Sequence, residues 1–204
     1  MAVSDLFLRR SWLLKSAIAM PLLAAVLSGC GTAAKNDTFD LSAPVGGSGP
    51  LAKGRQILVQ QPTALQALNS EQIVIKVSSS EIQYLAKAQW SDKLPRMVQA
   101  KLVEAYENSG KVGGVGIPGQ GLAIDYQVVT DIRAFEIRTG GGSQAVVEIS
   151  AKILNDRNGS VRAQKVFTQS VPTGGSSNEV FVKALDRAFA GVTSEIVDWT
   201  LKSI

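Results

Sequence analysis

Apolar residues after residue 54 recur with two different periods, and these periods predict strands and helices in a definite order. Short apolar runs within 55–60 and 72–77 are bounded by polar residues and proline, which is typical of buried strands. The segment 80–85 is a third candidate strand, because Ile82 and Tyr84 fall on one face of it. The domain is therefore expected to begin with β-structure.

From Asp92 to Gly110 the apolar spacing changes to three and four residues, which predicts an amphipathic helix. Asp92 is a candidate N-cap, Pro95 falls in the first turn, where its missing N–H is tolerated, and Gly110 is a candidate helix end. The predicted apolar face consists of Leu94, Met97, Val98, Leu102, Ala105 and Tyr106. Trp90, just before the helix, is expected to pack under its first turn.

Three longer segments, 122–138, 145–153 and 161–170, alternate apolar and polar residues and predict a meander of strands. Within the first of them, the apolar positions change from even to odd numbers near 133–136. A slip of one residue turns every following side chain to the other face of a sheet, so this change predicts a β-bulge.

A second helix is predicted after the meander. The spacing from Ser176 to Glu179 is that of a capping box. The apolar stripe that follows consists of Phe181, Leu185, Ala188, Phe189, Val192, Ile196 and Trp199. The order of strands, helix, strands and helix predicts an α+β fold, in which a largely antiparallel β-sheet carries two amphipathic helices packed on one face.

The first 29 residues have a different pattern, that of a removable signal peptide. Arg9, Arg10 and Lys15 give a positive start, and an apolar run over 16–28 follows, shorter than the ~20 residues that a membrane-spanning helix needs. The paired arginines leave two export routes open, the twin-arginine route and the general secretory route. Either route leads out of the cytoplasm.

Leu27, Ser28, Gly29 and Cys30 have the order of a lipobox, in which a branched apolar residue and two small residues precede a cysteine. We expect a signal peptidase to recognise Leu27, Ser28 and Gly29. The Cys30 thiol would carry a diacylglyceryl group, and an acyl chain such as palmitate would modify the freed amine. A lone cysteine can instead be a buried small apolar residue or a nucleophile. Cysteine–histidine catalysis is excluded because the chain has no histidine.

Composition divides the chain into three parts. Residues 1–29 are the predicted lipoprotein signal peptide. Residues 30–54 are rich in glycine, serine and alanine, so we expect a flexible tether from the lipidated cysteine, within which 38–41 is a candidate edge strand. Residues 55–204 are long enough for one hydrophobic core and are predicted to form a single α+β domain.

Net charge and cysteine content limit the kinds of partner and of cross-link that the chain can have. Removing residues 1–29 takes away three basic residues and one acidic residue, so the formal net charge falls from +4 to +2. The remaining chain has no block of lysine or arginine, which argues against a nucleic-acid partner. With Cys30 acylated, no thiol is left for a disulfide or a metal site.

The search for catalytic chemistry yields no catalytic residue, no cofactor and no metal site. The glycine-rich segments 113–116 and 140–142 lack the context of a phosphate-binding loop and are interpreted as loop tips. Asp125 and Asp131 could be paired carboxylates of an unrecognised enzyme, but their spacing favours a solvated sheet face. The chain is predicted not to be an enzyme.

Three large aromatic residues, Trp90, Phe135 and Trp199, fit the core or its edge. A buried-edge aromatic can also anchor a protein partner, and Trp90 and Phe135 are the candidates for that role here.

A resemblance to a known family rests on the order of several segments. Gln72–Tyr84 is a tyrosine-bearing strand, Trp90 and Asp92 open an amphipathic helix, and the segments 131–135 and 145–167 follow as strands before a closing helix. Together with the lipobox, this arrangement resembles the ABC-type transport auxiliary lipoproteins, which include the paraquat-inducible protein C-like lipoproteins.

The resemblance implies a non-catalytic accessory subunit of an ABC-type transport system for phospholipids or other hydrophobic compounds. Its implied partners are an MCE-domain protein and an ABC permease and ATPase complex, the ATPase being another chain. A structural or assembly lipoprotein of the outer membrane or of a secretion complex is the alternative. A homo-oligomer is possible, and the sequence does not identify the cargo or the surface that docks on the transporter.

The implied location is the periplasmic side of a bacterial envelope, with the membrane contacted through the N-terminal lipid. Gly31 follows the lipid cysteine, where an aspartate favours retention in the inner membrane. The outer membrane is therefore favoured over the inner one, although the choice stays open.

Overall fold

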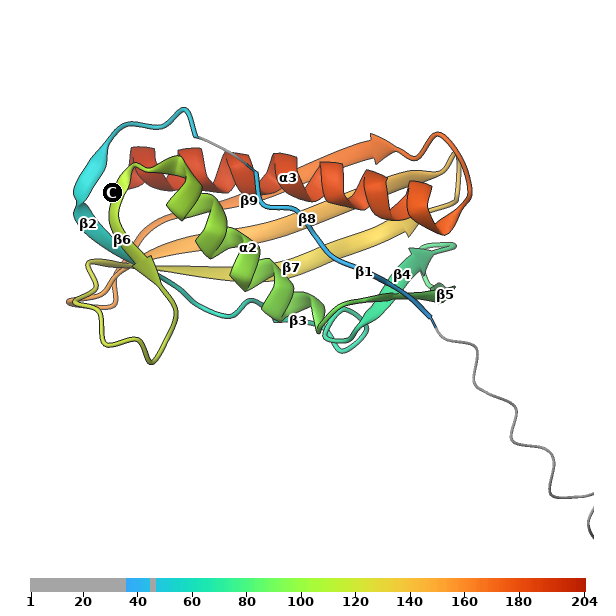
Figure 1. Cartoon of the computed structure of the whole chain (residues 1–204), viewed down its shortest axis with the longest axis horizontal. Coiled ribbons are helices and arrows are strands. Elements are labelled where there is room, and N and C mark those ends of the chain that lie inside the picture. The colour runs from blue at the N-terminus through green and yellow to red at the C-terminus, as the bar shows by residue number, and fades with distance from the viewer. Residues whose placement is uncertain (1–35, 45–46) are drawn as a thin grey trace, which may run out of the picture. The chain divides into compact units, whose positions relative to one another are not determined.

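The computed structural model describes residues 36–44 and 47–204, and every structural statement below concerns these residues. They contain one mixed sheet of nine strands and two helices (Figure 1). The elements, in chain order, are β1 (Asp37–Phe39), β2 (Ala52–Val59), β3 (Thr63–Ala64), β4 (Gln72–Lys76), β5 (Ile82–Trp90), α2 (Leu94–Ser109), β6 (Val112–Gly116), β7 (Tyr126–Arg138), β8 (Gln144–Asn155), β9 (Val161–Pro172) and α3 (Asn178–Ser203). Residues 1–29, the predicted signal peptide, lie outside the described part.

Strand β7 is the centre of the sheet, and both of its edges are paired. One edge pairs with β8 in antiparallel fashion along its whole length, and β9 pairs antiparallel with β8. The other edge is covered by three parallel strands in succession: β2 at Tyr126–Val128, β3 at Asp131–Ile132 and β4 at Glu136–Arg138. Strand β6 lies outside β2 and pairs parallel with it, while β5 lies outside β4.

The predicted fold class is confirmed. The sheet is mixed, and its two longest pairings are the antiparallel ones of the β7–β8–β9 meander. Both helices cover the same face of the sheet, with α3 over β7, β8 and β9 and α2 over β2 and β6 (Figure 1). Their C-terminal parts meet where the hydroxyl groups of Tyr106 and Thr200 lie 2.7 Å apart, both residues being buried. Burial raises the pKa of Tyr106, and the hydrogen bond to Thr200 only partly offsets this.

The predicted bulge in β7 is also confirmed. The register to β8 shifts between Ile132 and Ala134, so Arg133 is the extra residue. Ahead of the bulge Val128 and Ile132 face the helices, and after it Phe135 and Ile137 do so, each at most 1% exposed. The bulge therefore keeps apolar side chains on the core face across a change of parity.

Both predicted helix starts are displaced by one residue. The N-cap of α2 is Lys93, and Asp92 instead accepts a hydrogen bond from the Lys93 N–H at 2.7 Å. The N-cap of α3 is Ser177, whose hydroxyl oxygen accepts a hydrogen bond from the Val180 N–H at 3.4 Å. The predicted end of α2 at Gly110 is confirmed, because this residue has a left-handed backbone with φ of 60°.

The glycine-rich segment that was predicted to be a loop tip forms strand β6. Parallel pairing with β2 brings the chain very close to it at Gly113, where an added Cβ would lie 2.2 Å from the backbone oxygen of Lys53. Glycine is therefore required here by close approach of two strands. The second segment, 140–142, does lie in the turn between β7 and β8.

We expect Gly113→Ala to lower the free energy of unfolding by about 1–3 kcal/mol, since the new methyl group must push β6 away from β2. Gly114→Ala is the matched control, because its Cβ would find no atom closer than 3.7 Å. Urea unfolding followed by circular dichroism compares the two variants. Equal stability of both would show that the pairing of β6 with β2 is not tight at this point.

Candidate functional site

The two aromatic residues predicted to contact a partner lie in the core. Trp90 and Phe135 are each 1% exposed, and their rings pack edge to face with centroids 5.7 Å apart. Phe135 also packs against Phe189 of α3. The prediction of a partner contact is wrong for both residues, because a partner could reach them only if the core opened. Trp199, in contrast, is partly buried and packs on Phe167 at the edge of the core.

The two candidate carboxylates have separate neighbours. Asp125 accepts a hydrogen bond from the Gln56 N–H at 3.0 Å and lies 3.8 Å from an Arg55 guanidinium nitrogen. Asp131 accepts a hydrogen bond from the Thr63 hydroxyl at 2.8 Å. Each carboxylate thus attaches the β7 region to a strand of its parallel edge, β2 or β3. Among residues 36–44 and 47–204, no group of three or more acidic or cysteine residues could hold a metal ion.

The predicted tether is wrong for the described part of it. Residues 36–44 and 47–50, which we call the strap, pack against the domain rather than standing free of it, and 36–44 run between the two helices (Figure 1). Strand β1, Asp37–Phe39, opens the strap and pairs parallel with β5 at one end of the strand order, where the alternation over 38–41 had predicted an edge strand. Leu41 is only 3% exposed and belongs to the hydrophobic core.

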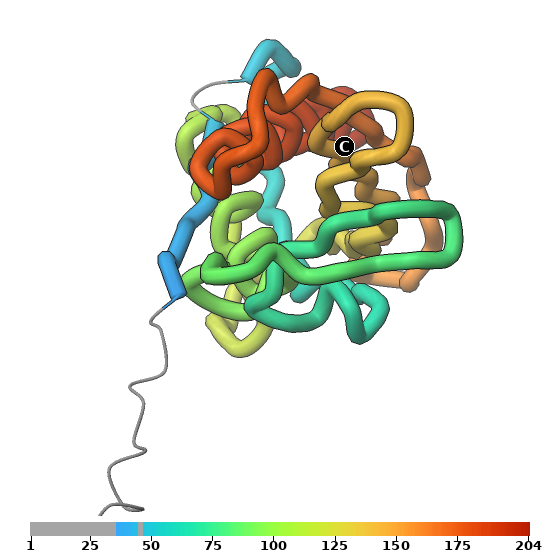
Figure 2. The backbone as a smooth tube through the Cα atoms, turned by 90° about the vertical axis from the view of Figure 1, so that its right-hand side faces the viewer, coloured from blue at the N-terminus to red at the C-terminus, as the bar shows by residue number. Residues whose placement is uncertain are grey.

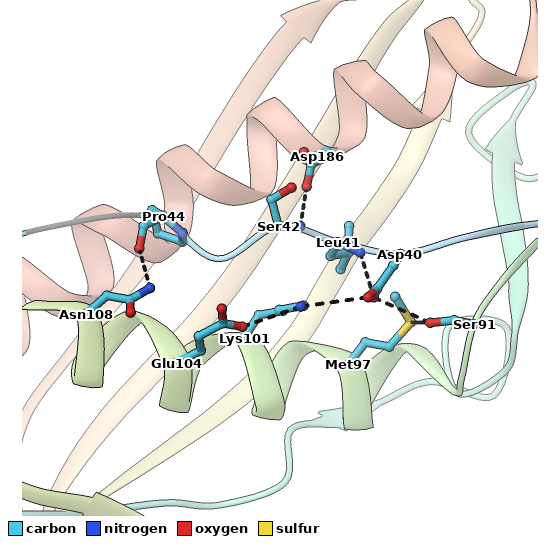
Figure 3. A network of polar contacts seen from close by, with 10 residues as sticks. All are labelled: Asp40, Leu41, Ser42, Pro44, Ser91, Met97, Lys101, Glu104, Asn108 and Asp186. Carbon is cyan, nitrogen blue, oxygen red and sulfur yellow. Dashed lines mark hydrogen bonds and ion pairs between the residues drawn. The ribbon is translucent and has the colours of Figure 1, made fainter.

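The first half of the strap is bonded to both helices (Figure 3). Asp40 lies 3.8 Å from the Lys101 ammonium of α2, and its Oδ1 accepts a hydrogen bond from the Leu41 N–H at 2.8 Å. On the other side, the Ser42 N–H donates to Asp186 of α3 at 2.7 Å. The first half of the strap therefore bridges α2 and α3.

The second half of the strap is held by one carboxylate. Asp198 of α3 accepts hydrogen bonds from the backbone N–H groups of Ser48 at 2.6 Å and Gly49 at 3.1 Å, and also from the Ser48 hydroxyl. The close approach is visible at Gly49, where an added Cβ would lie 2.7 Å from the Cβ of Leu201. Burial opposes ionisation of Asp198, but the donors from the strap, with Lys202, lower its pKa below the ordinary value.

Sequence reasoning missed the strap because its composition is that of a linker. The one available signal was the spacing of Phe39 and Leu41, two large apolar residues separated by a polar one. Asp198 gave no signal at all, since a single acidic residue on an amphipathic helix normally faces solvent.

A second surface lies at the end of the domain that faces the viewer in Figure 2, where the β4–β5 hairpin crosses. We call it the hairpin face and define it by five residues on the sheet face opposite the helices: Lys76, Ile82, Tyr84, Glu136 and Arg138. Strand register aligns Arg138, Lys76 and Ile82 in one row, and Glu136 and Tyr84 in the next row with Val74 between them.

Charged side chains lie next to exposed apolar and aromatic side chains on the hairpin face. The Arg138 Nε lies 2.8 Å and the Lys76 Nζ 3.9 Å from Oε1 of Glu136, whose side chain is only 8% exposed. The carboxylate is thus covered, while the two cations line an open cleft of about 370 Å³ with Ser78 and Ser79. Ile82 and Tyr84 are 43% and 41% exposed beside it.

The predicted lipobox, Leu27, Ser28, Gly29 and Cys30, lies outside the described residues, so lipid attachment at Cys30 stays a prediction. Within the described part, neither helix combines the length and the apolar character that crossing a bilayer requires.

Comparison with known proteins assigns the family. A family model described as the ABC-type transport auxiliary lipoprotein component matches residues 38–197. The match begins inside β1 and ends inside α3, so it includes the strap from Thr38 onward. The chain belongs to this family. We call the folded unit that begins at Asn36 and ends at Ile204 the auxiliary domain.

Among curated proteins, the auxiliary lipoprotein is similar to the uncharacterized protein bll6063 of Bradyrhizobium diazoefficiens, with 30% identity over 181 residues. The alignment covers 87% of this chain and 48% of that protein, so the chain spans about half the length of this relative.

Two solved structures share the fold. Protein XCC0632 from Xanthomonas campestris, described as a member of family DUF330, has 27% identity and a TM-score of 0.76, covering 82% of this chain and 95% of that one. The hypothetical protein CT253 from Chlamydia trachomatis has 10% identity and a TM-score of 0.52, covering 73% and 97%, respectively. The second likeness concerns the fold alone.

We expect Asp198→Ala to release the second half of the strap and to lower the free energy of unfolding by about 1–3 kcal/mol, because three donors lose a charged acceptor. Urea unfolding measures the loss, and hydrogen exchange at Ser48 and Gly49 reports the release. Arg187→Ala, at an exposed position of the same helix, is the control. Unchanged exchange at both amides would contradict the assigned bonds.

The same attachment should depend on pH. Since the pKa of Asp198 is lowered in the folded state, its contribution is fully present above the ordinary value of 3.8 and is lost as the pH falls through the lowered one. In the unaltered protein, hydrogen exchange at the Ser48 amide should lose its protection as Asp198 becomes protonated. In Asp198→Ala this pH-dependent loss of protection should be absent, because the acceptor is already missing.

Proposed function

We propose that this chain is a lipid-anchored, non-catalytic auxiliary subunit of an ABC-type transport system with an MCE-domain protein, moving phospholipids or other hydrophobic compounds. Acylation at Cys30 holds it on the periplasmic side of the envelope, in the outer membrane rather than the inner one. The membership in the auxiliary lipoprotein family supports the transport role. The structural bonding of Asp125 and Asp131 removes the carboxylate pair as a reason to propose catalysis.

The observation that carries the proposal is the packed strap. Only residues 31–35 separate Cys30 from Asn36, the first strap residue, whose side-chain amide donates to Gln89 of β5 at 2.9 Å. Six residue steps span at most about 22 Å in any conformation. A lipid on Cys30 therefore holds the auxiliary domain next to its leaflet, instead of letting it range over the distance that a 25-residue tether, 30–54, would allow.

A domain held this close to a leaflet serves as a fixed docking platform. Two acyl-bearing groups on one residue give stable anchoring, because each buried CH₂ contributes about 0.8 kcal/mol and a single chain binds only marginally. The ATPase and permease of the system are then separate chains, and this subunit contributes position and binding.

The lipid anchor predicts a defined modification and a defined partner set. Mass spectrometry of the protein from its native host should find an N-terminal Cys30 carrying acyl chains, and detergent extracts should yield an MCE-domain protein and a permease with it. We expect Cys30→Ala to remove the modification and to abolish membrane recovery of the chain. Recovery of a barrel-assembly or secretion complex instead would favour a structural role in the outer membrane.

The short reach can be tested separately from the anchor. We expect about 20 added glycine and serine residues between Gly31 and Asn36 to weaken transport-dependent growth on detergent without changing stability. The insertion raises the root-mean-square reach from about 13 Å to about 28 Å. The matched control places the same insertion in the exposed turn at Asn158 and Gly159. Full complementation by the extended variant would show that proximity to the leaflet is not needed.

A further inference from the structure

The hairpin face has the composition of a surface that meets lipid headgroups. Tyr84 has an amphipathic ring, Ile82 is apolar, and Lys76 and Arg138 supply positive charge beside them. Aromatic residues and basic residues gather at membrane interfaces, where the ring and the long side chains span apolar and polar layers. The four side chains share the sheet face that the helices do not cover.

The exposed charges of the hairpin face are positive and can bind an anion. Lys76 and Arg138 are 34% and 42% exposed, whereas Glu136 between them is covered, so the outward side of the cleft presents cations. The hydroxyl groups of Ser78 and Ser79 line the same cleft. A guanidinium and an ammonium group with neighbouring hydroxyl donors match the oxygens of a phosphate group. Glu81 in the hairpin turn is bonded to Gln83 at 3.1 Å and lies outside this cleft.

The place where the chain enters the domain, at Asn36, lies close to the hairpin face. Because Asp37 pairs with Ala88, Asn36 enters beside the exposed Lys87 of β5. Tyr84 and Ile82 precede Lys87 by three and five residues on the same strand, so both lie within about 17 Å of it. This distance is shorter than the 22 Å reach from Cys30, so a leaflet that holds the lipid can meet the hairpin face.

We infer that the hairpin face binds the phosphate-bearing headgroups of the leaflet in which Cys30 is anchored. Lys76 and Arg138 contact phosphate oxygens, while Ile82 and Tyr84 enter the interfacial layer beside them. The inference rests on the proposed acylation of Cys30. It adds a second point of membrane contact, which fixes the orientation of the auxiliary domain on the leaflet.

A single-cysteine experiment tests this contact. Once Cys30 is acylated, Ile82→Cys provides a free thiol for an environment-sensitive fluorophore. The acylated full chain is reconstituted into vesicles of phosphatidylethanolamine and phosphatidylglycerol that contain a headgroup spin-labelled phospholipid. We expect the Ile82 label to lose most of its emission through quenching by the spin label.

The matched control is Val161→Cys, an exposed apolar position at the start of β9. Val161 pairs with Leu154, which pairs with Gln127, so it lies at the opposite end of β7 from Arg138, roughly 35 Å away. Its label should keep its emission. Equal quenching at the two positions, or none at Ile82 in vesicles that contain the acylated protein, overturns the inference.

A charge variant separates phosphate contact from mere proximity. Lys76→Gln in the Ile82→Cys background keeps the bond between Arg138 and Glu136, so folding is preserved, and should reduce the quenching. Lys152→Gln, on the same sheet face but far along β8, should not. Unchanged quenching in Lys76→Gln overturns the phosphate contact.

Two further outcomes identify which proposal fails. An unacylated Cys30, seen by mass spectrometry of the same preparation, overturns the proposed function and this inference together. An acylated and incorporated protein whose Ile82 label is protected only after an MCE-domain protein is added overturns this inference alone, because the hairpin face then belongs to a protein interface.

Discussion

The need to satisfy both edges of β7 organises the fold. A strand of 13 residues in the middle of a sheet has backbone N–H and C=O groups along both sides, and leaving either side open would expose a long edge. Strand β8 covers one edge completely. The other is covered by one continuous stretch of chain, from Ile57 to Lys76, which runs along β7 as β2, β3 and β4 with breaks between them. This stretch is parallel to β7, so the chain must cross over through α2 before it forms β7, and this places α2 on the same face as α3.

The same arrangement leaves two positions for function. The helices meet at Tyr106 and Thr200, and the strap supplies Leu41 to the core and donates backbone hydrogen bonds to Asp186 and Asp198. At the end of β7, the β4–β5 hairpin extends past the core, and its strand β5 is exposed on both faces near Ile82 and Gln83. In the proposed function, the strap shortens the path from an acylated Cys30 to the domain and brings that path to the hairpin end. The proposed position on a membrane, and the surface proposed to face it, both follow from the packing of this N-terminal segment.

The local apolar periodicity predicted an element correctly wherever one face of that element is buried. The bulge at Arg133 was predictable, because a change of apolar parity has one explanation inside a continuous strand. Strand β6 was not, because Gly113 is required by the close approach of Lys53, and that approach is a long-range contact. Trp90 and Phe135 were correctly recognised as core aromatics, but their alternative role as partner contacts failed once burial was known. The helix starts were displaced by one residue for two reasons. The N-cap of α2, Lys93, makes no side-chain cap hydrogen bond, so no capping pattern marks it, and at α3 either of two adjacent serines can supply the capping hydroxyl.

By itself the sequence determined the α+β class, the two amphipathic helices, the meander with its bulge, and the signal-like N-terminus with its lone cysteine. All of these depend on periodicity or on residues adjacent in the chain, which are the interactions that a sequence displays directly. Only the tertiary structure decided that the strap packs on the helices and that Lys76, Arg138, Ile82 and Tyr84 share one face. Those features join segments from three strands, or bond a linker-like segment to a carboxylate 149 residues away, and no local pattern records such pairings.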